Sequence, residues 1–352
     1  MLLTILSFAV VAGVIITLHE FGHFAAARLT GMRVKKFSIG FPPRMFTRKI
    51  GETEFSLSWI PLGGYVQIAG MVDESLDSEG ITGAPDEFSS KNALQKTFVL
   101  SAGVLMNYLT AFLIMIGLTL VMGVPEIGKS QVGEVISGRP AEKAGILAND
   151  RIVEVDGSPV STWEDVIRTI SASKDSVHLA LVRGDANQRF EVIVPTDTVN
   201  EEGQVRRVIG IGPFIEFRSA GFVESISRSA GFCYSTTLGL VGFIGDMVTG
   251  KGSITQLSGP VGVAKLSGDS ARQGPGAFIF FIAFVSVSIG FLNILPLPVL
   301  DGGQITFVLI EAITRRTIPV KVKLIIQQVG IAALLLLVLV VSYNDIMRIF
   351  AN

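Results

Sequence analysis

The first 27 residues carry only three ionisable side chains, and all three lie in the pentapeptide His19-Glu20-Phe21-Gly22-His23. An apolar stretch of this length is sufficient to cross a bilayer, which takes about 20 residues. An ionisable group is costly to place at membrane depth, so its presence there indicates a functional site. The run 2–28 therefore predicts a first transmembrane helix that carries a chemically active motif.

The spacing within this motif is that of a metal site on a helix. His19 and His23 are four residues apart, which places both imidazoles on one helical face, where they can bind one metal ion. Glu20 follows the first histidine and can act as general base toward a water at that metal. The alternative is a pair of interfacial histidines near a helix end, which an apolar span disfavours. The motif predicts a zinc hydrolase site in a membrane.

The composition is that of an integral membrane protein with some soluble mass. Hydrophobic residues make up 49% of the 352 residues and charged residues 17%, whereas soluble domains carry about 25% charged residues. The net charge of −1 and the lack of a basic face exclude a nucleic-acid partner. The single cysteine, Cys233, excludes a disulfide framework and a cysteine-based metal site. Because the third histidine, His178, lies in a polar stretch, the third metal ligand is expected to be a carboxylate.

Asp301 is the carboxylate that meets this expectation. It is the only charged side chain between Gln273 and Ile310, and it lies between two prolines and the pair Gly302-Gly303. Such a composition breaks a helix at membrane depth, which is tolerated where the freed backbone is buried or lines a cavity. Asp301 is predicted as the third metal ligand, and the alternative is a loop aspartate that caps a helix starting at Gln304.

Apolar runs and strand-like alternation predict the remaining membrane elements. Asn107 is the notable polar residue of the second span, and a packing role and a catalytic role for it both stay open. Residues 33–70 are expected to form two short strands with a turn at Pro61, giving a β-hairpin at the membrane. The acidic residues 73–90 are expected to form a mobile loop. Transmembrane helices are predicted at 2–28, 97–124, 276–300 and 324–343.

Residues 127–200 are charged and globular in character. A helical turn that starts at Pro140 and ends at Gly145 is expected there, followed by a strand and the turn Asp156-Gly157. This string resembles a PDZ domain of the kind found in bacterial proteases, which implies an α+β fold that adds a peptide to a sheet edge. A spacer that binds nothing tightly is the alternative.

Lysine and arginine residues near the span ends predict the orientation of the chain in the membrane. They gather between spans one and two and between spans three and four, which places both loops in the cytoplasm. Both termini and residues 127–200 are then extracytoplasmic, and His19, His23 and Asp301 share a cytoplasm-proximal depth. The basic residues are Arg28, Arg33, Lys35, Lys36, Arg44, Arg48, Lys49, Lys91, Lys96, Arg315, Arg316, Lys321 and Lys323.

The predicted fold is thus a polytopic α-helical membrane protein with four transmembrane helices, a membrane-associated β-hairpin and an inserted α+β PDZ domain. The segment after the PDZ domain is read as a linker with an interfacial amphipathic helix at 223–249, and a fifth span at 232–248 is the alternative. The predicted parts are the first half of the membrane domain (1–126), the PDZ domain (127–200), the linker (201–275) and the second half of the membrane domain (276–352).

The histidine motif in the first span, the run from Asn293 to Gly303 in the third and the PDZ-like insert together resemble the site-2 protease family. The resemblance covers nearly the whole chain and is greatest to bacterial proteases that cleave anti-sigma factors. It implies intramembrane zinc proteolysis of single-span membrane proteins or signal-peptide remnants, in the lipid of the bacterial inner membrane. Many such relatives carry two PDZ domains, whereas residues 127–200 accommodate one.

The resemblance also implies a role for each site residue by its position in the motifs. The zinc ligands are His19, His23 and Asp301, and Glu20 is the general base. Val104, three residues before Asn107, stands where the family usually has proline. The residues that the resemblance places against the substrate are Asn293, Gly63, Gly64, Tyr65 and Asn107.

Two other function classes compete with a protease. A receptor or scaffold that works through its PDZ domain would leave His19 and His23 dispensable, and the complete set of ligands and base disfavours it. A metal transporter would need further polar groups in spans two and four, which are nearly absent from these spans.

Overall fold

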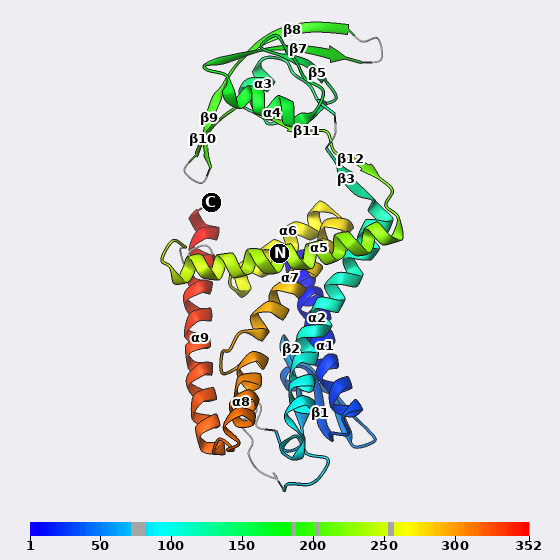
Figure 1. Ribbon diagram of the computed structural model, residues 1–352, viewed down its shortest axis with the longest axis vertical. Helices are drawn as coiled ribbons and strands as arrows, with labels where there is room; N and C mark the ends of the chain where they lie inside the picture. The colour runs from blue at the N-terminus through cyan, green and yellow to red at the C-terminus, as the bar shows by residue number, and fades with distance from the viewer. Residues whose placement is uncertain (72–81, 128, 185–187, 202–203, 253–256, 352) are drawn as a thin grey trace. The chain divides into compact units, whose positions relative to one another are not determined.

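The computed structural model describes residues 1–71, 82–127, 129–184, 188–201, 204–252 and 257–351 (Figure 1). The chain forms two compact units. The first consists of Met1–Leu120 and Gly221–Asn352, and the second, Val121–Ala220, is inserted between these two halves.

Five helices of the first unit are long and apolar enough to cross a membrane, among the residues that the structure describes. The four predicted spans fall on α1, α2, α7 and α9, while α5 is the least apolar of the five and has none of its most apolar stretch buried. In Figure 1, α5 runs across the direction of the other helices rather than along it. The five are α1 (Leu2–Leu29), α2 (Ala93–Met122), α5 (Phe222–Val248), α7 (Pro275–Ile294) and α9 (Val320–Ala351).

A shorter helix, α6 (Pro260–Gln273), packs against both α1 and α9. It packs against α1, where Gly268 lacks the side chain that would collide with Thr4. Asp345 of α9 is buried and accepts hydrogen bonds from the backbone N–H groups of Gly259 and Gly262 at 2.9 and 2.8 Å. A carboxylate at a helix N-terminus satisfies unpaired N–H groups and complements the helix dipole, so α9 caps α6.

The third predicted span, 276–300, is shorter than expected. Helix α7 ends at Ile294, because the prolines at 296 and 298 cannot continue it. The chain then turns back, and α8 (Asp301–Thr314) begins at Asp301 itself and not near Gln304. A Cβ atom at Gly302 or Gly303 would collide with the carbonyl oxygens of Ile294 or Leu297, so this tight turn requires the glycine pair.

Two long antiparallel strands, β1 (Val34–Ile50) and β2 (Thr53–Ile68), form the β-element. The prediction of a turn at Pro61 is wrong: the turn is at Gly51, which has a φ of +60°, and β2 continues to Ile68. Glycine adopts this left-handed conformation without a steric penalty.

Both strands bend, so residues 34–39 pair with 64–68 and also with 54–57. The segment 64–68 has this one pairing among the described strands and is therefore an edge of the sheet. Gly64 lies against α1, where a Cβ atom would be 3.0 Å from Cγ of Glu20 and 3.0 Å from Cγ2 of Ile16. Gly64 thus lets a sheet edge lie close to the histidine motif, and the chain does not turn there.

The predicted loop 73–90 lies partly outside the described residues. In the described part, a single turn of 3-10 helix, η1 (Phe88–Ser90), follows Glu87. The Glu87 carboxylate is buried and accepts hydrogen bonds from the Thr82 hydroxyl at 2.7 Å and from the backbone N–H of Gly83 at 2.9 Å. These hydrogen bonds, the Thr82 hydroxyl foremost, lower the pKa of Glu87 to about 2. Glu87 therefore holds residues 82–89 together as a carboxylate.

The second unit is wider than the predicted 127–200. Its first strands, β3 and β4, pair with β12 and β11, which lie after residue 200, so the segment expected to be a linker begins with strands. A four-stranded sheet has the order β6-β5-β7-β8. The elements are β3 (Val124–Glu126), β4 (Val132–Val135), α3 (Pro140–Lys143), β5 (Arg151–Val155), β6 (Ser158–Pro159), α4 (Trp163–Ala172), β7 (Ser176–Arg183), β8 (Gln188–Pro195), β9 (Asp197–Glu201), β10 (Gln204–Val208), β11 (Ile211–Pro213) and β12 (Glu216–Arg218).

Candidate active site

The structure brings together the three predicted metal ligands, two from α1 and one from the first turn of α8. The nitrogen and oxygen atoms that they offer all lie within 4.8 Å of one another. Nε2 of His19 is 3.3 Å from Oδ2 of Asp301, and Nε2 of His23 is 3.4 Å from Oδ1 of the same carboxylate. The two Nε2 atoms are 3.2 Å apart. His178 lies in the second unit, on β7, and takes no part in this cluster.

This cluster fits a zinc ion. Two imidazole nitrogens and one carboxylate oxygen are the protein ligands of a catalytic zinc site, which leaves one position for water or substrate. Oδ2 of Asp301 is buried and has no hydrogen-bond partner among the described residues. A buried carboxylate oxygen without a hydrogen bond is unfavourable, and a cation between Asp301, His19 and His23 would satisfy it.

Gly103 of α2 makes room for the two histidines. A Cβ atom at this position would overlap Nε2 of His23 and lie 2.8 Å from Nε2 of His19. Helix α2 therefore passes directly over the two metal-facing nitrogens. Sequence reasoning missed this residue, although a glycine inside an otherwise apolar helix is a signal of close packing or function.

Helix α2 also contacts the other nitrogen of each imidazole. Nδ1 of His23 is 2.8 Å from the backbone carbonyl oxygen of Val99. Nδ1 of His19 is 3.2 Å from the side-chain amide of Asn107. Metal-bound histidines almost always have such a partner on the second nitrogen, which fixes the ring orientation. The Val99 contact could not be foreseen, because it is made by the backbone.

A cavity of about 50 Å³ adjoins the ligands. Glu20 lines it together with His19, His23 and Asp301. One water needs roughly 10–15 Å³ of such space, so the cavity can hold water next to the Glu20 carboxylate. Its other walls come from the sheet edge, from Met71 three residues beyond it and from α2, namely Val66, Ile68, Met71, Val99 and Leu100.

The predicted substrate-contacting residues fall into three groups: Asn293, the stretch Gly63–Tyr65, and Asn107. Asn293, near the end of α7, points its amide nitrogen toward Nε2 of His19 at 3.5 Å, on the side where the metal would lie. Gly64 lies beside Glu20, and Gly63 and Tyr65 are half-buried next to it on β2.

Asn107 does not fit the substrate-contacting role that the motif position implied. Its side chain is fully buried, is not among the residues that line the cavity, and faces the edge of His19 that points away from Asp301. A substrate in the cavity could not contact it.

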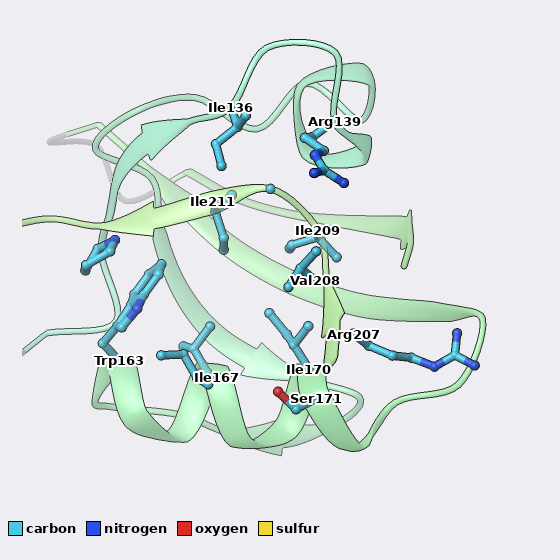
Figure 2. Close-up of a pocket in the computed structure, with 13 residues that line it drawn as sticks. Ile136, Arg139, Trp163, Ile167, Ile170, Ser171, Arg207, Val208, Ile209 and Ile211 are labelled. Carbon is cyan, nitrogen blue, oxygen red and sulfur yellow. The ribbon is translucent and has the colours of Figure 1, made fainter. Parts of the chain in front are cut away.

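A second, larger cavity lies within the inserted unit. It is a groove of about 480 Å³ between α4 and the segment from Arg207 to Pro213 (Figure 2). Ile167 and Ile170 of α4 face Ile209 and Ile211 across it. Arg139 and Arg207 line one end of this apolar groove, and each is paired with an aspartate, Asp197 at 2.9 Å and Asp175 at 3.4 Å.

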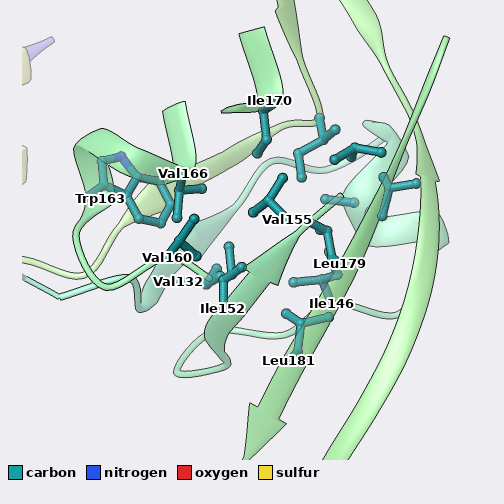
Figure 3. Packing of buried hydrophobic residues seen from close by; sticks show 14 residues of the cluster. Val132, Ile146, Ile152, Val155, Val160, Trp163, Val166, Ile170, Leu179 and Leu181 are labelled. Carbon is teal, nitrogen blue, oxygen red and sulfur yellow. The ribbon is translucent and has the colours of Figure 1, made fainter. Parts of the chain in front are cut away.

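The floor of this groove is part of the hydrophobic core of the unit (Figure 3). Trp163, Val166, Ile170 and Ile209 line the groove and also belong to the core cluster. Because these side chains are packed on their inner side, the groove has a preformed apolar surface, as small-ligand and peptide sites usually have.

The names of similar proteins agree with the zinc site described above. A relative from Rickettsia conorii, named as a zinc metalloprotease, is 33% identical over 99% of this chain and 100% of its own. The zinc metalloprotease RasP of Oceanobacillus iheyensis is 28% identical, and the regulator of sigma-W protease RasP of Bacillus subtilis 25%, each over 99% of both chains. The PDZ domain of an SdrC-like protein from Listeria monocytogenes is 25% identical over 26% of this chain and 90% of that domain, with a TM-score of 0.21.

The family model of peptidase family M50 matches residues 7–337. This match includes both the histidine motif on α1 and Asp301 on α8. The chain therefore belongs to peptidase family M50, the site-2 proteases, and is a zinc metalloprotease.

Proposed function

We propose that this protein hydrolyses peptide bonds within the transmembrane segments of single-span membrane proteins, such as anti-sigma factors or signal-peptide remnants. The observation that carries the proposal is the position of His19 and His23. Both lie within α1, a helix long and apolar enough to span the bilayer, and both are at most 9% exposed. A metal site at this depth acts on peptide bonds that are themselves in the membrane.

The proposed chemistry assigns one role to each polar group in the cavity. His19, His23 and Asp301 would hold the zinc ion, which would supply Lewis acidity that lowers the pKa of a water to about 7 and polarises a carbonyl. Glu20 accepts the proton of the attacking water and passes it to the leaving amine. The amide N–H of Asn293 donates a hydrogen bond to the carbonyl oxygen as negative charge develops there.

A substrate must lose helical structure before it can be cut, since each backbone N–H and C=O of a transmembrane helix is bonded internally. The edge segment 64–68 supports a way to offset this cost. An unwound substrate can pair with the free edge as an added strand, which satisfies its exposed backbone groups beside Glu20. Substrates with helix-weakening residues in the span are expected to be preferred.

The proposed arrangement in the membrane has four spans, α1, α2, α7 and α9, with α5 lying at the interface. The buried Ser225 and Ser229, the low apolarity of α5 and its transverse course favour the interface. The basic residues around the β-element and between α8 and α9 place these loops in the cytoplasm of a bacterium. The termini and the inserted unit are then extracytoplasmic, and the metal site is nearer the cytoplasm.

Cleavage of a single-span substrate in proteoliposomes tests this function and orientation. The products, measured by mass spectrometry, are expected to show a cut inside the substrate span, in the half nearer its cytoplasmic end. A zinc chelator is expected to stop cleavage, and added zinc to restore it. A cut in the extramembrane part of the substrate, or cleavage that survives chelation, would contradict the proposal.

We further propose that the groove of the PDZ-like unit binds peptides that end in an apolar residue. The isoleucine-rich walls offer apolar contact. Among the described strands β11 pairs with β4 alone, so its other side offers backbone groups for an added strand. Extracytoplasmic termini of substrates, or of fragments left by another protease, are the ligands that such a site could reach in the proposed orientation.

A peptide-binding measurement on the full-length protein tests the groove. Ile167, 46% exposed on α4, lines it, and Ile167→Glu is expected to weaken binding of a labelled peptide with an apolar C-terminus at least tenfold. The control is Ile193→Glu, because Ile193 is 66% exposed on β8 and does not line the groove. Equal binding by both variants would make the unit a spacer instead.

A further inference from the structure

We propose that Asn107 is a positioning residue for the metal site, whose amide oxygen accepts a hydrogen bond from the Nδ1–H of His19 when zinc is bound. The bond fixes the ring of His19 with Nε2 directed at the metal. The proposal rests on His19 being a zinc ligand, and it gives Asn107 a role that neither substrate contact nor helix packing predicts.

Two features of the amide point to this bond. Nδ2 of Asn107 is 3.2 Å from Nδ1 of His19, while Oδ1 of the same amide is buried without a hydrogen-bond partner among the described residues. The oxygen and nitrogen of an asparagine are assigned from the surrounding hydrogen bonds, and a half-turn about the last side-chain bond exchanges them.

Zinc binding decides which arrangement is satisfied. A neutral imidazole that binds a metal through Nε2 carries its proton on Nδ1. With Nδ2 of Asn107 facing this N–H, two donors would meet, and Nδ1–H, Nδ2–H and Oδ1 would all lack partners. With Oδ1 facing it, the N–H is bonded and only the amide N–H group is left over. Unpaired buried polar groups are unfavourable, so the second arrangement, which leaves fewer of them, is the more stable.

His23 shows the same pattern with an acceptor that cannot be exchanged. Its Nδ1 faces the carbonyl oxygen of Val99, so the proton must be on Nδ1 and Nε2 is left for the metal. Val99 and Asn107 are eight residues apart, about two turns of α2. One helix thus orients both imidazoles of the neighbouring helix.

The position of Asn107 is itself fixed from α7. The hydroxyl of Ser286 donates to the backbone carbonyl of Asn107 at 2.9 Å, and a Cβ atom at Gly290 would lie 3.2 Å from Cβ of Asn107. Both contacts hold α2 at a set distance from α7. A positioning residue needs such support, because a ligand is oriented only as well as its partner is held.

Three substitutions in the full-length protein separate the roles open to Asn107. Asn107→Asp keeps the acceptor oxygen, Asn107→Leu removes it at similar size, and Thr110→Val removes a hydroxyl that bonds its own helix at Met106. The zinc dissociation constant is measured by chelator competition on the purified proteins after they have been reloaded with zinc. Asn107→Leu is expected to weaken zinc binding by about 10–100-fold, Asn107→Asp to bind at least as tightly as the wild type, and Thr110→Val to be unchanged.

The aspartate variant keeps the test decisive even if the leucine variant does not fold. Weaker zinc binding by Asn107→Asp would mean that the amide N–H is the group used, and it would overturn the proposal. So would unchanged zinc binding by Asn107→Leu with a raised KM, the sign of a substrate contact. His19→Ala tests whether His19 is a zinc ligand, on which the proposal rests. Zinc binding that survives this change would remove His19 as a ligand and the proposal with it.

Discussion

Replacing Glu20 with glutamine is expected to lower kcat by roughly a hundredfold to ten-thousandfold while the protein still holds zinc. General base catalysis contributes roughly 10²–10⁴ to the rate, and an amide cannot accept the proton of the attacking water. The three ligands remain, and glutamine has nearly the size of glutamate, so the contact of Gly64 with this side chain is kept. Metal content by mass spectrometry and cleavage of a single-span substrate are measured on the same sample.

The control for this change is Glu164→Gln, at an exposed position of α4 in the inserted unit. It is expected to match the wild type in both zinc content and rate. Full activity of Glu20→Gln would remove Glu20 as the base. Loss of zinc from Glu20→Gln would instead make this carboxylate part of the metal site.

Adding a single methyl group at Gly103 is expected to empty the metal site. The Cβ atom of Gly103→Ala would overlap Nε2 of His23 and press on His19, so the two rings cannot both face the metal unless α2 moves away. Packed helices resist such movement, and inserting a methyl group into a tight core contact costs about 1–3 kcal/mol. We expect zinc content near zero and no cleavage, with helical content by circular dichroism unchanged.

Gly117→Ala provides a matched control on the same helix. A Cβ atom at Gly117 meets nothing within 4 Å, and alanine is favoured over glycine in a helix by about 1 kcal/mol. This variant is expected to keep both zinc and activity. If Gly103→Ala held zinc as well as Gly117→Ala does, the close approach of α2 to the histidines would have no functional meaning.

The residues that meet at the candidate metal site could be predicted from the sequence because charge is scarce in an apolar chain. His19, Glu20, His23 and Asp301 stand out for that reason, and the membrane itself limits where they can go. Gly103 and Val99 are uncharged residues of an apolar helix, so they do not stand out in this way. Their roles depend on the distance between α1 and α2, and one of them acts through its backbone oxygen. Such contacts depend on how the helices pack, so they cannot be predicted from the spacing of residues within one segment of the sequence.

The strand and domain boundaries show a different limit. A proline followed by two glycines is a strong turn signal, yet β2 runs through residues 61–64 and the chain turns at Gly51. Close packing of Gly64 on α1 explains the glycine there better than a turn does. The inserted unit was predicted too short because β11 and β12 are brief strands, and their partners lie roughly 75 to 95 residues earlier.

The division of the metal site between two distant parts of the chain has a consequence for biosynthesis. His19 and His23 are made at the start of translation, and Asp301 follows after roughly 280 further residues, on the order of tens of seconds at 5–20 residues per second. Until α8 folds back against α7, a growing chain holds two ligands of three. We therefore expect a nascent chain to be inactive until α8 has been made and has folded against α7.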